Sequence, residues 1–89
     1  MEINPIKLIL NITESLRGRF LDSNCSYSVP DLVIDYLNHG EAKVALELLI
    51  DQLFELNIFV SKTEFESLLD LARLYKCDDR NSLAFIGIL

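Results

Sequence analysis

The sequence contains one histidine, His39, and only three glycines. A zinc site would need that histidine together with both cysteines and a fourth ligand, and nothing in the sequence clusters these groups. Three glycines are too few for a P-loop or another glycine-rich phosphate cradle. The G-x-S-x-G motif of hydrolases and the twelve-residue EF-hand calcium loop are also absent. We therefore expect no enzyme, no cofactor and no metal.

Cysteine is scarce as well, with Cys25 and Cys77 far apart and in no C-x-x-C pattern. Small secreted scaffolds usually hold more cysteines, so we expect reduced thiols in a cytoplasmic protein. The first residues, "MEINPIKLILNI", place an acid at Glu2 and polar residues within the apolar run, which is unlike a secretion signal. No segment approaches the roughly 18 consecutive apolar residues that a membrane span requires.

Positive charge is in the minority, because eight Lys and Arg face fourteen Asp and Glu for a net charge of −6. A protein that binds a phosphate backbone needs clustered Lys and Arg, so the balance argues against nucleic acid and permits a cationic protein partner. The hydrophobic share of 51% is that of a folded chain, and 89 residues suffice for one domain, 1–89, with a modest core.

Apolar residues at helical spacing predict an all-α fold of four main helices. The first helix begins with Asn4 as N-cap and Pro5 as its first residue, and is expected to fray near Gly18 before a polar loop over 21–30. Its expected core face consists of Ile6, Ile9, Leu10, Leu16 and Phe20.

The second helix is expected to start at Pro30, with Val29 as N-cap because a residue before proline avoids the helical region. Gly40 is the expected stop. The third helix covers about 41–56 and is apolar on so many sides that we expect several neighbours around it. Asn57 is suited to ending it in the left-handed conformation.

The fourth helix has the clearest start, the capping box "SKTE" at Ser61 to Glu64. Short connections between the second, third and fourth helices predict antiparallel neighbours. The apolar C-terminal segment 82–89, "SLAFIGIL", is expected to dock on the bundle as a short helix or strand-like segment, or to pair with another chain. The free protein is accordingly expected to be a monomer or a weak homodimer.

Acidic residues recur four positions apart on three successive predicted helices. The series are Asp31–Asp35, Glu47–Asp51–Glu55 and Glu66–Asp70. Each like-charge pair at this spacing destabilises a helix by about 0.2–0.5 kcal/mol, and a lysine at position 51 would relieve the middle series. Two interpretations stand: an ordinary solvated face, or a docking face for a cationic protein.

Under the docking interpretation, aromatic residues beside the acids would act as anchors. The candidate partner-binding residues on the second and third helices are Asp31, Asp35, Tyr36, His39, Glu41, Glu47, Asp51 and Glu55.

The runs "LVIDYLNHGEAKVALELLIDQLFE", Leu32 to Glu55, and "VSKTEFESLLDLARL", Val60 to Leu74, resemble the Maf-type immunity proteins of bacterial polymorphic toxin systems. These are related in role to the immunity proteins of contact-dependent inhibition. The resemblance implies a small cytoplasmic protein that binds and neutralises the toxic C-terminal domain of a cognate secreted toxin, often a basic nuclease. The alternative is a helical adaptor or small regulatory subunit unrelated to toxins.

Overall fold

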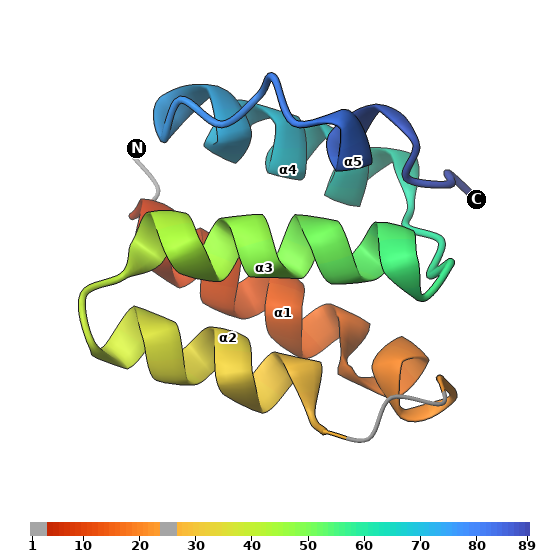
Figure 1. Cartoon of the computed structure of the whole chain (residues 1–89), viewed down its shortest axis with the longest axis horizontal. Coiled ribbons are helices and arrows are strands. Elements are labelled where there is room, and N and C mark those ends of the chain that lie inside the picture. Colours follow the sequence, from red (N-terminus) through yellow and green to blue (C-terminus); the bar gives the residue numbers. More distant parts are fainter. Residues whose placement is uncertain (1–3, 24–26) are drawn as a thin grey trace.

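Five helices account for most of the computed structural model, which describes residues 4–23 and 27–89 (Figure 1). In chain order they are α1 (Pro5–Leu21), α2 (Val29–Asn38), α3 (Ala42–Glu55), α4 (Lys62–Leu74) and α5 (Asn81–Ala84). The four longer helices and the all-α class are as the sequence predicts. Cys25 lies outside the described residues, whereas Cys77 is a buried free thiol.

Helix α3 is the centre of the bundle and packs against each of the other four helices. In Figure 1, α2 lies on one side of α3, α4 and the C-terminal tail lie on the other, and α1 runs behind. The fully buried side of α3 consists of Ala45, Leu46, Leu49, Ile50 and Leu53. The expectation of a central, many-sided helix is therefore confirmed.

Most of the residues that the sequence predicts to start or end a helix do so in the structure. The Asn4 side chain accepts hydrogen bonds from the backbone of α1, and Ser61 and Glu64 form both halves of a capping box. Gly40 and Asn57 adopt positive φ angles of 75° and 53° after α2 and α3. A third residue with a positive φ angle, Lys76 (φ 58°), follows the end of α4.

The end of α1 and the start of α2 differ from expectation. Helix α1 continues through Gly18 to Leu21, because Leu16 and Phe20 are buried on either side of the glycine and hold the last turn in place. The N-cap of α2 is Ser28 rather than Val29, which is itself buried.

The core face of α1 also differs from the predicted one. Ile6 and Leu10 are 45% and 36% exposed, and Ile12 and Thr13 are buried in their place. The Thr13 hydroxyl donates to the Ile9 carbonyl at 2.7 Å, which satisfies its polar atom inside the core.

The tail docks in both of the ways predicted for it, as a short helix and as an extended segment. Leu83 and Ile86 are buried, and Val60 and Ile88 form an isolated parallel bridge. Within residues 4–23 and 27–89, no helix combines the length and apolarity needed to cross a membrane.

Candidate functional site

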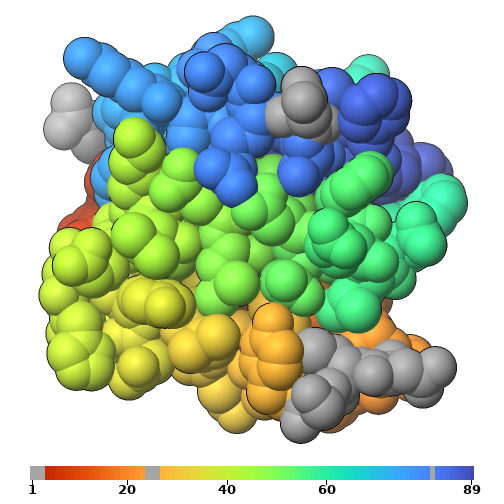
Figure 2. All heavy atoms as spheres, viewed as in Figure 1, coloured from red at the N-terminus to blue at the C-terminus, as the bar shows by residue number. Residues whose placement is uncertain are grey.

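Two acids of the series on α3, Glu47 and Asp51, form ion pairs with Arg80, the N-cap residue of α5. Its guanidinium donates to Glu47 Oε2 at 2.9 Å, and to both carboxylate oxygens of Asp51. Figure 2 shows the blue segment after α4 lying directly against the green α3. Because Glu47 and Asp51 are one turn apart, their carboxylates converge on one guanidinium, and the hydrogen bond with Asp51 raises the pKa of Arg80.

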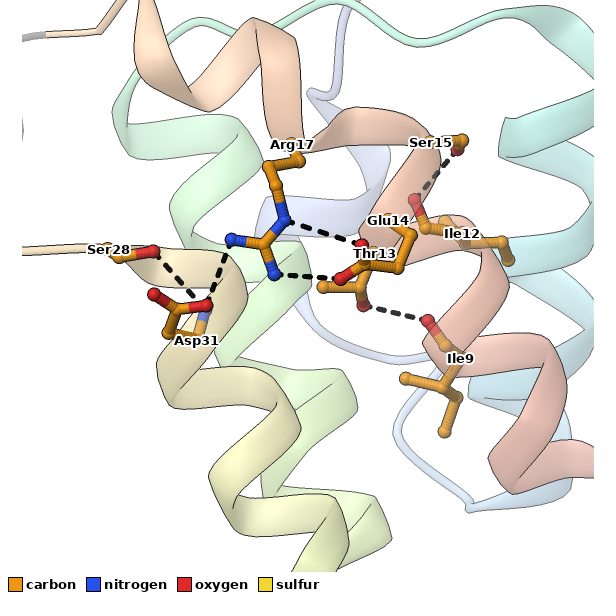
Figure 3. Close-up of polar contacts among 8 residues, drawn as sticks. All are labelled: Ile9, Ile12, Thr13, Glu14, Ser15, Arg17, Ser28 and Asp31. Atoms are coloured by element: carbon orange, nitrogen blue, oxygen red, sulfur yellow. Dashed lines mark hydrogen bonds and ion pairs between the residues drawn. The ribbon is translucent and has the colours of Figure 1, made fainter.

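Arg17 on α1 holds a second pair of acids (Figure 3). It donates to Glu14 at 2.7 Å, one turn earlier on its own helix, and to Asp31 at 2.9 Å on α2. Hydrogen bonds with Arg17 and Ser28 hold the pKa of Asp31 below its ordinary value, and the two carboxylates raise the pKa of Arg17. This pair joins α1 to the first turn of α2.

Arg19 makes the third connection, from α1 to the start of α4. It donates to Glu64 Oε1 at 2.7 Å and to the Phe59 carbonyl at 3.2 Å. Burial of the Glu64 carboxyl opposes its ionisation, but the Ser61 backbone N–H and Arg19 more than offset this, so the pKa of Glu64 is lowered. Glu64 therefore serves the capping box and an interhelical ion pair together.

These three connections change the interpretation of the acidic stretch. Three candidate partner-binding residues, Asp31, Glu47 and Asp51, have arginine partners within the chain. The arginines lie in the N- and C-terminal flanks, which hold most of the basic residues. Sequence reasoning missed them as partners because residues 14 to 33 positions apart, on different helices, show their contact only once the chain is folded.

The remaining candidates lie in two separate places. Asp35, His39 and Glu41 surround the turn between α2 and α3, with their side chains exposed and Tyr36 half-buried beside them. His39 caps α2 and lies 3.6 Å from the Asp35 carboxylate. Glu55 is exposed at the opposite end of α3, about 20 Å away along a helix of this length. The eight candidates therefore do not form one continuous face.

Two exposed carboxylates, those of Asp35 and Glu41, flank the turn between α2 and α3, and we call Asp35, His39 and Glu41 the acidic turn. Asp78 and Asp79, before α5, form another exposed acidic pair that has no ion-pair partner among the described residues. Within the described part of the chain, no Lys or Arg nitrogen lies within 4.0 Å of the carboxylate of Asp35, Glu41 or Glu55. Exposed carboxylates without an internal cationic partner are available to a cation on another molecule.

The described residues hold no cluster of three or more metal-ligating side chains. Burial raises the pKa of the Cys77 thiol, which disfavours the reactive thiolate. A hollow of about 220 Å³ lies between the end of α1 and the start of α2, with Arg17, Tyr27 and Pro30 in its lining. Its other polar lining residues are Ser23 and Ser28.

Comparison with known proteins found no relative. No protein-family model matches the chain, and no curated protein or solved structure shows significant similarity to it. Functional assignment therefore rests on the residues and their geometry.

Proposed function

We propose that this chain is an immunity-type protein that binds and neutralises the C-terminal toxin domain of a cognate secreted toxin, in the cytoplasm of the cell that makes both. The observation that supports it is the acidic turn, where Asp35 and Glu41 are exposed and lack an Arg or Lys partner among the described residues. The role itself is the one that the resemblance of residues 32–74 to Maf-type immunity proteins implies, and no family model matches the chain.

The mechanism would be stoichiometric occlusion rather than catalysis. A nuclease is basic around its substrate channel because it must bind phosphates. Acidic side chains on an inhibitor steer the encounter with such a surface, and an aromatic beside them supplies contact area. Asp35 and Glu41 provide the charge here, and Tyr36 provides the adjacent ring. Glu55 would contribute at the rim, whereas Asp31, Glu47 and Asp51 would act mainly by holding the helices in position.

Co-expression with the C-terminal domain of a large secreted protein encoded beside this chain tests the proposal. Cells that produce both should survive where cells with the toxin domain alone die. If both cultures die at the same rate, the immunity role is wrong.

A pair of charge-matched variants tests the site. Asp35→Lys with Glu41→Lys should abolish protection, while Glu66→Lys with Asp70→Lys on α4 changes the net charge equally and should leave protection intact. All four carboxylates are exposed, so both variants should fold. Equal protection by the two would place the toxin contact away from the acidic turn.

A further inference from the structure

Apolar side chains from three segments gather at the C-terminal end of α3. We define this aromatic end as five residues, with exposed fractions of 39% for Phe54, 51% for Phe59, 71% for Phe85, 45% for Ile88 and 76% for Leu89. In Figure 2 the dark-blue tail adjoins the teal connection after α3 at the right of the molecule. A contiguous exposed apolar area of this kind usually marks an interface.

The aromatic end is held in place by specific contacts. The rings of Phe54 and Phe85 lie 6.2 Å apart at 44°, within the range of favourable aromatic pairs. The Phe59 ring covers Gly87 so closely that a Cβ there would be 3.0 Å from it. Buried Leu83 and Ile86 anchor the tail beneath. Few conformations therefore have to be lost when a partner binds.

The tail also presents an open backbone edge. Val60 N–H donates to the Gly87 carbonyl at 2.9 Å, and Leu89 N–H donates to the Val60 carbonyl at 2.8 Å. The N–H and C=O of Ile88 point the other way, since these groups alternate along an extended chain, and they form no backbone hydrogen bond within the described residues. An exposed apolar edge of this kind is a template for pairing with another strand.

We infer that a second copy of this chain covers the aromatic end, with the two tails antiparallel across a two-fold axis. In that arrangement each Ile88 lies opposite its counterpart and exchanges both backbone hydrogen bonds with it. The five side chains expose roughly 500–600 Å² per copy, if a fully exposed apolar side chain presents about 200 Å². That approaches the ~800 Å² per partner of a standard interface, so the dimer is weak and forms at high protein concentration.

Dimerisation through the aromatic end and toxin binding through the acidic turn should depend on salt in opposite ways. The aromatic end contains no ionisable side chain, while each copy has a net charge of −6 that opposes association. Added salt screens that repulsion and leaves apolar burial intact, so dimerisation strengthens with salt. Binding of a basic toxin through the acidic turn weakens with salt. The inference does not depend on the proposed function.

Sedimentation equilibrium over a wide range of protein concentration, at low and high salt, tests the inference. The mass of the wild-type chain should rise towards twice the monomer mass at high concentration, and at lower concentration when salt is added. Phe85→Asp should keep the chain monomeric. Leu74→Asp introduces the same charge at an exposed leucine on α4, outside the aromatic end, and should still dimerise.

Ile88→Pro, compared with Ile88→Ala, tests the backbone pairing separately, because both changes remove the exposed Ile88 side chain and only proline removes the N–H. Proline removes the Ile88 N–H, which no internal backbone bond uses, and leaves the hydrogen bonds of Val60, Gly87 and Leu89 possible. Circular dichroism should show native helix content, and the chain should be monomeric. A wild-type chain that stays monomeric throughout would overturn the inference. So would dimerisation that Phe85→Asp and Ile88→Pro leave unchanged.

Discussion

Arg17 and Arg80 each bind two carboxylates, and their own side chains are almost equally exposed, at 34% and 33%. Their acidic partners differ. Glu14 and Asp31 are 50% and 66% exposed, whereas Glu47 and Asp51 are 27% and 32% exposed. Water competes for the carboxylates of Glu14 and Asp31 far more than for those of Glu47 and Asp51. The ion pairs of Arg80 should therefore stabilise the fold more than those of Arg17.

The two arginines also connect different parts of the chain. Arg17 joins α1 to α2, which already share a broad apolar contact through buried residues such as Val29 and Val33. Arg80 fixes the start of the short helix α5, and with it the direction in which the tail crosses α3. The contact of α5 with α3 is smaller than that of α1 with α2, so the ion pairs of Arg80 are expected to matter more, and mutation tests this comparison.

The largest effect is expected from Asp51→Lys. The change removes both hydrogen bonds from Arg80 to Asp51 and places two cations together. The free energy of unfolding should fall by about 1–3 kcal/mol, the range for partly buried hydrogen bonds to charged groups. Urea denaturation with tryptophan-independent detection, such as circular dichroism, measures it because the chain has no Trp.

Glu55→Lys is the matched control for that variant. It makes the same charge change on the same helix, at an exposed residue near the negative end of the helix dipole, so stability should stay equal or rise slightly. The sequence alone predicts that Asp51→Lys is also harmless, because Glu47 would gain a lysine four residues on. Equal stability of the two variants would mean that the Arg80 connection contributes nothing measurable.

That disagreement shows where sequence reasoning ends. Most helix starts and stops were predictable because each depends on a few adjacent residues, as with Asn4 and Pro5, Gly40, and the Ser61–Glu64 capping box. The last turn of α1 was not, because buried Leu16 and Phe20 outweigh the local preference of Gly18.

The candidate site was predictable only in part. The acids were visible in the sequence, and their spacing placed Glu47 and Asp51 on one side of α3. Their partner was not visible, because Arg80 reaches them through the path of the α4–α5 connection. The exposure of Ile6 and Leu10 has a similar origin: periodicity gives the apolar stripe of a helix, but neighbouring elements decide how much of it is covered.

An intermediate effect, dependent on pH, is expected at Glu64, whose side chain is 15% exposed. Since folding lowers its pKa, its contribution is present above the ordinary Glu value of 4.5 and is lost as the pH falls through the lower folded value. Glu64→Gln should reduce stability at neutral pH by about 1 kcal/mol, typical of a lost cap. It should also make stability less dependent on pH in the acidic range.

Denaturation midpoints measured from neutral pH down to strongly acidic pH test this expectation. Glu66→Gln, at an exposed position on the same helix, should follow the wild-type curve throughout. If Glu64→Gln also follows it, the ion pair with Arg19 does not stabilise the folded state.

The smallest effect is expected from Arg17→Met, which keeps much of the apolar stem and removes the guanidinium. Its acidic partners are at least half exposed, so water replaces the lost bonds at little cost, and the broad α1–α2 contact remains. The loss of thermal stability should be less than half of that in Asp51→Lys. It should shrink further with added salt, which screens exposed charges more than partly buried ones. A loss as large as that of Asp51→Lys would show that the exposure of the carboxylates does not set the strength of these connections.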